Sequence, residues 1–192
     1  MIQSKEYPSS SKPAAKKRGD GRSSLIGAAR IAFEEVGFDG THSNDIARRA
    51  GYSPQTFYRH FGDKVEIFLA VYEQWVESEA NAVDIADGVR SMADSLIQHH
   101  IAHRVFRRSL RTLTVTDPRV GKVRAAIRIW QADALARRHP RFSQLSNAKR
   151  LAVLLQLERH CDAIADGEWT ALAVDLTTSQ DMLQDILEAH FY

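Results

Sequence analysis

The sequence predicts an all-α protein, and three observations carry this prediction. Aromatic residues make up 8% of the 192 residues, the chain has only ten glycines, and alternating runs of β-branched residues are few. Apolar residues instead recur every three or four positions, which is the period of an amphipathic helix. With 44% hydrophobic residues, the chain can bury the core of one large or two small domains.

Composition also bounds where the protein acts. No stretch of about 18 uncharged apolar residues occurs, so we expect no membrane segment. The single cysteine, Cys161, excludes an intramolecular disulfide and suits a reducing cytoplasm, where we expect the protein to reside. Its neighbour His160 points away from it on a helix, so we interpret Cys161 as a packing residue rather than a nucleophile.

Residues 1–21 form a basic N-terminal segment. Residues 1–22 hold six Lys or Arg and two acidic residues, a net charge of +4, whereas the whole chain carries +2. Prolines, serines and few apolar residues predict a flexible arm rather than a folded element or a secretory signal. Such an arm can follow DNA phosphates or lie in a minor groove, with Lys16, Lys17 and Arg18 as contacts. A tail that is only solvated is the alternative.

Residues 23–36 are the first predicted helix. Ser23 or Ser24 can cap it, and Gly37 ends it. One side of the helix carries an apolar stripe made of Leu25, Ala29, Ala32, Phe33 and Val36. This stripe supplies the third wall that two short helices need, so we expect a three-helix domain over residues 22–63.

The stretch from residue 41 to residue 64 predicts a helix-turn-helix. Residues 45–50 can form a short helix, and Gly51 tolerates a positive φ where that helix must stop. Ser53 then stands where an N-cap side chain accepts an amide hydrogen, and Pro54 fits the first position of a second short helix.

The second short helix has two unlike faces. Phe57 and Phe61 are four residues apart and can pack together onto Ile46 and Ala50 of the first helix. The outer face and its edges hold side chains suited to a DNA groove, and the DNA-binding candidates of this helix are Pro54, Gln55, Thr56, Tyr58, Arg59 and His60. A satellite helix pair with aromatic anchors is the alternative. The turn, the cap and the polar outer face together favour DNA binding.

The candidates divide into side chains that read bases and side chains that hold the backbone. Gln55 and Asn44 can pair with adenine in the major groove, and Arg59 can pair with guanine. Tyr58 and His60 can reach either a phosphate or a base edge. A base contact discriminates between sequences, whereas a phosphate contact only positions the protein.

Thr41, Ser43 and Lys64 are the expected phosphate contacts. The segment from Asp63 to Glu66 predicts a variant capping box that starts a long amphipathic helix. Lys64 lies in the first turn of that helix, where a cation opposes the helix dipole but can grip a phosphate. We interpret this local conflict as a sign of function.

These residues also carry a family resemblance. The segment DIARRAGYSPQTFYRHFGDK (residues 45–64), preceded by LIGAARIAFEEVGFDGT, resembles the DNA-binding domain of the tetracycline-repressor (TetR) family of bacterial transcription regulators. The match is specific over about residues 22–76, and beyond it only helix lengths and order are similar. His42 stands where many members have threonine, and Ser43 stands where many have an apolar residue.

Further amphipathic helices are predicted after the long one, at about residues 89–103, 104–113, 118–138, 147–166 and 179–191, with Thr178 or Ser179 as the last cap. His99 and His103 are four residues apart and could suggest a metal site. No carboxylate or cysteine completes a ligand set nearby, so we interpret these histidines as solvated or hydrogen-bonded and expect no metal and no cofactor.

The resemblance implies about nine helices, with residues 64–192 forming a ligand-binding and dimerisation domain. In the family the last two long helices form a four-helix bundle with those of a second subunit. The candidate pocket residues are His103, Phe106, Leu110 and Trp130. The candidate dimer contacts are Leu154, Leu157, Cys161, Met182, Leu183 and Leu187. A two-fold dimer suits a palindromic operator, because two recognition helices about 34 Å apart read two half-sites.

The sequence therefore predicts a DNA-binding transcriptional regulator, most simply a repressor that a small apolar or amphipathic molecule releases from its double-stranded DNA operator. The alternative keeps the fold but uses DNA as a platform, so that residues 64–192 bind a protein partner. An enzyme is not expected, because G-x-S-x-G, H-E-x-x-H and Gly-rich phosphate-loop motifs do not occur.

Overall fold

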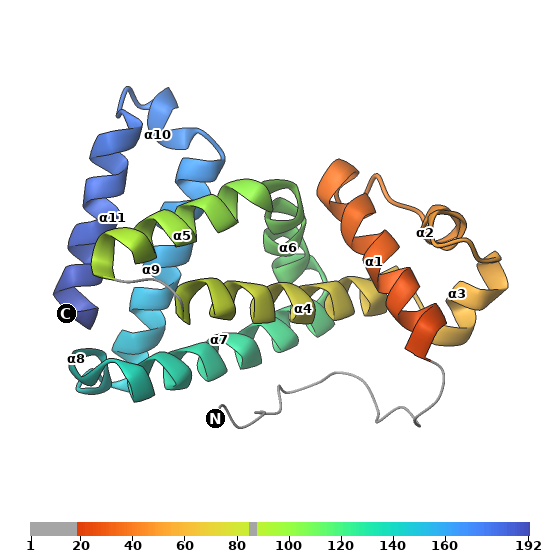
Figure 1. Ribbon diagram of the computed structural model, residues 1–192, viewed down its shortest axis with the longest axis horizontal. Coiled ribbons are helices and arrows are strands. Elements are labelled where there is room, and N and C mark those ends of the chain that lie inside the picture. The colour runs from red at the N-terminus through yellow and green to blue at the C-terminus, as the bar shows by residue number, and fades with distance from the viewer. Residues whose placement is uncertain (1–18, 85–87) are drawn as a thin grey trace. The chain divides into compact units, whose positions relative to one another are not determined.

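The computed structural model describes residues 19–84 and 88–192, and these form helices joined by loops (Figure 1). Eleven helices are described. They are α1 (Gly19–Val36), α2 (Ser43–Arg49), α3 (Pro54–His60), α4 (Lys64–Asp84), α5 (Gly88–Ala102), α6 (Arg104–Thr116), α7 (Pro118–Arg138), α8 (Pro140–Ser143), α9 (Asn147–Ala165), α10 (Glu168–Ala171) and α11 (Leu176–Phe191). The arm residues Lys16, Lys17 and Arg18 lie outside the described residues.

The all-α class is confirmed, and nine of the described helices correspond to the nine expected. The other two, α8 and α10, have four residues each. Three helix starts differ from the prediction. Helix α1 begins at Gly19 rather than Ser23. Helix α2 begins at Ser43 rather than Asp45. Helix α11 begins at Leu176, because Asp175 caps it by accepting the Thr178 N–H at 2.8 Å.

The chain divides into two compact units. Unit 1 comprises residues 1–77 and 105–123, and unit 2 comprises residues 78–104 and 124–192. The division falls within α4 and α7 and at the start of α6. Unit 1 therefore contains α6 and the first turns of α4 and α7 in addition to the three N-terminal helices, whereas the sequence alone suggested a boundary after residue 63.

An aromatic cluster forms the centre of unit 1. Phe68 of α4 meets the ring of Phe33 edge-on at a centroid distance of 5.1 Å and that of Phe38 at 5.4 Å. It also stacks on Phe106 of α6 at 4.6 Å. Phe33, Phe68 and Phe106 are almost completely buried. These ring contacts join α1, α4 and α6 into one core.

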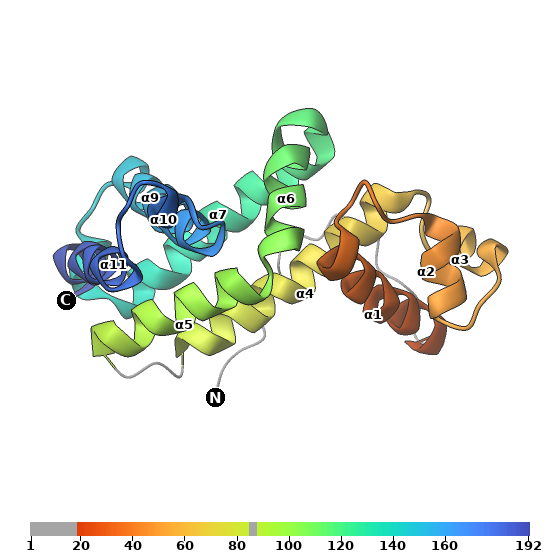
Figure 2. The same ribbon diagram turned by 90° about the horizontal axis from the view of Figure 1, so that it is seen from above.

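Unit 2 is built around α5, α9 and α11, which lie together in both views (Figures 1 and 2). Their apolar core comprises Met92, Ala93, Ile97, Phe142, Val153, Leu157, Cys161, Leu183, Leu187 and Phe191. This core also contains polar groups. His100 Nδ1 and Asp162 Oδ1 lie 3.0 Å apart and are both buried, and His160 Nε2 lies 2.6 Å from the carbonyl oxygen of Ser179.

The long helices are amphipathic rather than uniformly apolar. Among residues 19–84 and 88–192, none of the helices has the length and apolar character needed to cross a bilayer.

Candidate nucleic-acid interface

The turn between α2 and α3 has the geometry that the sequence predicts. Gly51 has a φ of +79°, in the left-handed region that glycine adopts readily. The N–H of Tyr52 donates to the carbonyl of Ala47 at 2.9 Å, which closes the end of α2. Ser53 occupies the N-cap position of α3. The sequence predicts that its side chain accepts an amide hydrogen there, but in the structure it does not. Its hydroxyl instead lies 3.3 Å from that of Thr56.

Helix α3 has one buried and one exposed face. Phe57 and Phe61 are buried with ring centroids 5.8 Å apart, and Ile46 of α2 is buried with them, whereas Ala50 is only half-buried. The exposed residues of α3 are Pro54, Gln55, Tyr58 and Arg59. Phe57 and Phe61 therefore fix α3 on its buried face, and its polar side chains stay accessible on the other face.

The last residue of α3 lies against the first turns of α1. His60 is half-buried, and a Cβ atom added to Gly21 would lie 3.1 Å from its Nε2 atom. Glycine at position 21 thus allows the imidazole ring to approach the α1 backbone closely. The structure places His60 beside α1 rather than on the exposed face of α3.

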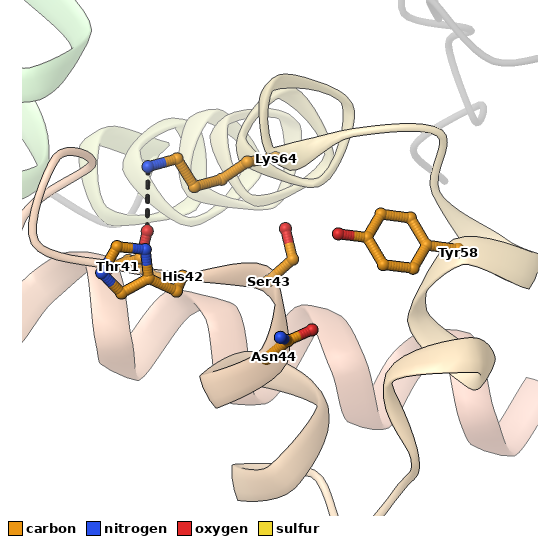
Figure 3. Close-up of a pocket in the computed structure, with 6 residues that line it drawn as sticks. All are labelled: Thr41, His42, Ser43, Asn44, Tyr58 and Lys64. Atoms are coloured by element: carbon orange, nitrogen blue, oxygen red, sulfur yellow. Dashed lines mark hydrogen bonds between the residues drawn. The ribbon is translucent and has the colours of Figure 1, made fainter.

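A shallow pocket of about 280 Å³ opens beside α2 and α3. It is lined by Thr41, His42, Ser43, Asn44, Tyr58 and Lys64, five of which were DNA-binding candidates. In Figure 3 the hydroxyl groups of Ser43 and Tyr58 point toward one another across the pocket. The side chains of Ser43, Asn44 and Tyr58 bring two hydroxyl groups and an amide to the pocket. It therefore gathers hydrogen-bond donors suited to an anion such as a phosphate.

Lys64 and Thr41 contribute to this pocket through bonds within the chain. The Lys64 ammonium donates to the carbonyl oxygen of Thr41 at 2.8 Å (Figure 3). It also donates to the carbonyl oxygen of Phe38 at 2.7 Å and lies 4.0 Å from the centroid of the Phe38 ring. Burial lowers the pKa of Lys64, and the Asp39 carboxylate opposes that shift. The buried Thr41 hydroxyl donates to the carbonyl of Gly37 at 2.7 Å. Both side chains thus hold the loop that precedes α2.

The start of α4 is fixed by a reciprocal cap and an arginine. Asp63 Oδ1 accepts the Glu66 N–H at 2.8 Å, and Glu66 reaches back to the Gly62 N–H at 2.7 Å. This agrees with the predicted capping box, except that Glu66 accepts from the N–H of Gly62 rather than from that of the cap residue Asp63. Arg119 of α7 donates to Asp63 Oδ2 at 2.6 Å and to Asp117 Oδ2 at 2.9 Å.

These ion pairs shift the carboxylate pKa values. Partial burial alone would raise the pKa of Asp63, but the hydrogen bonds from Arg119 and the Glu66 N–H lower it overall. The bond from Arg119 also lowers the pKa of Asp117, and the two carboxylates raise the pKa of Arg119.

Two arginines of α2 are paired with carboxylates. Arg48 lies 3.0 Å from Asp45, and Arg49 forms two hydrogen bonds with Glu35 of α1, at 2.6 and 3.1 Å. The Arg49 bond lowers the pKa of Glu35 and raises that of Arg49. The charges of both arginines are thus balanced at the surface of unit 1.

The four predicted ligand-pocket residues do not all belong to one unit. Phe106 and Leu110 of α6 are buried in the core of unit 1. His103 and Trp130 belong to unit 2 and are half-buried. The rings of His99 and His103 meet edge-on at 4.7 Å. In the described part of the chain, His, Cys, Asp and Glu do not gather in groups of three that could hold a metal ion.

Most of the predicted dimer contacts face the chain's own core. The buried residues of this set are Leu154, Leu157, Cys161, Leu183 and Leu187. Helix α9 packs on α5, α10 and α11, which accounts for its wide apolar arc without a second subunit. Met182 of α11 is 40% exposed, and Leu155 of α9, which the sequence reading did not select, is 46% exposed.

Sequence reasoning did not find Ser109 or Arg119. Ser109 Oγ accepts the Phe38 N–H at 2.9 Å, across 71 positions of the chain. The Arg119 to Asp63 pair spans 56 positions. A hydroxyl and a charge at such separations leave no local pattern in the sequence, so the three-dimensional structure is needed to reveal these pairs.

Comparisons with known proteins agree with this geometry. Residues 25–71 match the model of the bacterial regulatory proteins of the tetR family. The HTH-type transcriptional activator FasR of Mycolicibacterium smegmatis is 35% identical over 66 residues, which are 34% of this chain and 30% of FasR. The HTH-type transcriptional repressor BdcR of Escherichia coli is 27% identical over 135 residues, covering 62% of this chain and 68% of BdcR.

The fold extends this similarity over most of the chain. A crystal structure described as a TetR-family transcriptional regulator from Rhodococcus sp. superposes with a TM-score of 0.66 at 19% identity, covering 91% of this chain and all of that one. The helix-turn-helix of α2 and α3 and the match over residues 25–71 identify a DNA-binding domain of the tetR-family type. Over the rest of the chain, the similarity to the Rhodococcus structure is one of fold.

Proposed function

We propose that the chain is a cytoplasmic repressor that binds a palindromic operator as a homodimer and leaves it when a small apolar or amphipathic molecule binds. The observation that carries the DNA-binding part is the exposed polar face of α3 beside the donor-lined pocket. The match to BdcR supports repression, because it extends over 62% of this chain whereas the match to FasR covers 34%.

Each group at the interface has a chemical role in this proposal. Gln55 and Arg59 are exposed on α3 and read adenine and guanine edges in the major groove. Asn44 contributes a further amide at the pocket. Ser43 and Tyr58 bind a backbone phosphate there, since their hydroxyls converge (Figure 3).

Five further candidates have weaker support as direct contacts. Thr41 already donates its hydroxyl hydrogen to the Gly37 carbonyl. Lys64 uses two of the three ammonium hydrogens on carbonyl oxygens, so at most one N–H bond serves a phosphate. His60 lies beside α1, and Pro54 and Thr56 shape the start of α3.

Base reading is tested with a duplex that the wild-type protein selects from a random library. Gln55→Ala should cost about 1 to 3 kcal/mol on this duplex and much less on a scrambled one, because an adenine contact is lost. Gln74→Ala, which removes an exposed glutamine of α4, is the matched control. Equal losses on both duplexes would contradict the placement of α3 in the groove.

Dimerisation is supported by exposed apolar side chains on α9 and α11. Leu155 and Met182 are 46% and 40% exposed, respectively, and such apolar surface favours a partner. Leu155→Glu and Met182→Glu should shift the protein toward monomer in sedimentation, and operator affinity should fall with it. Leu172→Glu, at an exposed leucine after α10, is the control. A wild-type monomer at micromolar concentration would contradict this part of the proposal.

Ligand release requires that the ligand bind the DNA-free form more tightly than the DNA-bound form. A coupling free energy of about 1 to 3 kcal/mol is typical of such regulation. Helix α6 is the candidate lever, because it belongs to unit 1 and follows α5 of unit 2 directly in the chain. Thermal-shift screening should find small molecules that stabilise the protein and weaken DNA binding. Stabilising molecules that leave DNA affinity unchanged would favour the DNA-platform alternative.

A further inference from the structure

Helix α6 holds the loop between α1 and α2 through one hydroxyl group. Ser109 Oγ accepts the Phe38 N–H at 2.9 Å and donates to the Val105 carbonyl of its own helix at 3.3 Å. The loop comes very near this hydroxyl, since a Cβ atom on Gly37 would lie 3.1 Å from Ser109 Oγ. The contact therefore depends on an oxygen at position 109 and on a glycine at position 37.

Hydrogen bonds also connect the loop between α1 and α2 to the edge of the pocket. The Phe38 carbonyl accepts from the Lys64 ammonium at 2.7 Å and from the Thr41 N–H at 3.2 Å. The Thr41 hydroxyl returns to the Gly37 carbonyl, and Ser43 begins α2 two residues later. Hydrogen bonds thus connect residues 37–41 to one another, to Ser109 at one end and to the pocket residue Lys64 at the other. A shift of the loop at Phe38 is transmitted to Thr41 and to the start of α2.

A second contact fixes the other side of the pocket. Arg119 donates to Asp63 at 2.6 Å and to Asp117 at 2.9 Å. Asp63 is the residue that caps α4, and Lys64 follows it immediately. The first turn of α7 therefore holds the start of α4, while α6 holds the loop before α2. All of these contacts lie within unit 1.

We infer that Ser109 and Arg119 are positioning residues for DNA binding, which set the arrangement of the phosphate-binding pocket from α6 and α7 without contacting DNA. The inference rests on the proposed function and specifies how α6 acts as its lever. A movement of α6 that breaks the Ser109 bond releases the loop at Phe38 and lowers DNA affinity.

The two contacts differ in strength. The Phe38 N–H and Ser109 are partly buried. Removing the Ser109 hydroxyl therefore leaves the Phe38 N–H without an acceptor at a site where water replaces it poorly. Arg119 is 54% exposed, and solvent screens its ion pairs. The Ser109 contact accordingly dominates, and Arg119 adds a smaller, salt-sensitive contribution.

The test uses the full-length chain and the duplex selected by the wild-type protein. Ser109→Ala should weaken binding about five-fold while the slope of affinity against salt stays unchanged, because no phosphate contact is lost. Ser109→Thr should restore affinity, and hydrogen exchange at the Phe38 amide should accelerate only in the alanine variant. Thr112→Ala is the matched control, because its hydroxyl bonds within α6 to the Arg108 carbonyl.

A second control separates positioning from general stability. Ile67→Val removes one buried methylene from α4 and should lower the melting temperature while leaving DNA affinity intact. If Ile67→Val and Ser109→Ala weaken DNA binding equally, or if the Phe38 amide exchanges faster without loss of affinity, the positioning role of Ser109 is overturned.

Arg119 is tested against a charge control on the same helix. Arg119→Gln should weaken binding about two-fold at low salt, whereas Lys122→Gln, at an exposed lysine, should have little effect. Equal losses would show a long-range charge effect and overturn the role of Arg119. A wild-type chain that enriches no duplex would overturn the proposed function, whereas an enriched duplex bound equally by the variants would overturn only this inference.

Discussion

The two units of this protein use polar groups in different ways. Unit 1 has a core of packed aromatic rings and buries Thr41 and Arg107, but the other polar residues of α3 and the pocket are exposed or half-buried. Unit 2 encloses the His100–Asp162 pair and the His160–Ser179 bond within its core. Buried hydrogen-bonded groups require exact partners, whereas exposed ones stay available to bind another molecule. The difference separates a surface prepared for a partner from an interior that defines one packing arrangement.

The largest expected effect comes from the same substitution made in each unit. Phe68→Ala in unit 1 and Phe142→Ala in unit 2 each remove a fully buried ring, and each should cost about 3 to 5 kcal/mol of stability. Thermal denaturation measures this loss. Hydrogen exchange should show faster opening of α1 only with Phe68→Ala. If Phe142→Ala opens α1 to the same extent, the units unfold as one and the comparison fails.

The buried pair of unit 2 provides the next effect. Asp162→Ala removes a carboxylate 3.0 Å from His100 Nδ1 and should destabilise the protein by about 2 to 4 kcal/mol. Asp185→Ala, at an exposed position of α11, should be nearly neutral. Chemical denaturation compares the two. Similar losses would show that the buried pair contributes no more than a surface aspartate.

Alanine substitutions at two glycines of unit 1 should change stability in opposite directions. Gly27 lies inside α1 with open space around an added Cβ, so Gly27→Ala should stabilise the protein by about 0.5 to 1 kcal/mol. At Gly40 an added Cβ would lie 2.7 Å from the Val36 carbonyl oxygen, so Gly40→Ala should destabilise it by about 1 to 3 kcal/mol. Melting temperatures decide the sign, and a stabilised Gly40→Ala variant would contradict the close approach.

The smallest effect is an acid dependence in unit 1. The pKa values of Asp63 and Asp117 are lowered, so their stabilisation is complete above about pH 4, the range of an unfolded aspartate, and is lost as pH falls through the folded values. Arg119→Gln should lower the melting temperature by about 1 to 3 °C at pH 7. This difference should vanish at the acid end of a pH series. A difference that persists at pH 2.5 would point to lost packing instead.

The parts of the molecule that sequence reasoning found are those with local signals. The turn at Gly51 and the cap at Asp63 depend on residues within a few positions, and the structure has both. The start of α1 was missed because residues before Ser23 read as part of the basic arm. Neither the short helices α8 and α10 nor the cap at Asp175 was foreseen, since a single turn leaves no apolar period to recognise.

The parts that could not be found depend on distant contacts. His100 and Asp162 are 62 positions apart, and nothing in either segment identifies the other. The apolar arc of α9 was interpreted as a surface for a second subunit, yet residues such as Leu157 pack on the chain's own helices. Periodicity shows that a face is buried, but it does not show which element buries it.

The paired arginines of α2 have a consequence for how the protein searches a chromosome. Non-specific attraction to DNA grows with the number of cations that displace counterions from the backbone. Asp45 and Glu35 already balance Arg48 and Arg49, so these two cations add little to indiscriminate adsorption. Under the proposed function, non-specific adsorption would therefore gain little from these two arginines, and selectivity would rest on the contacts of α3.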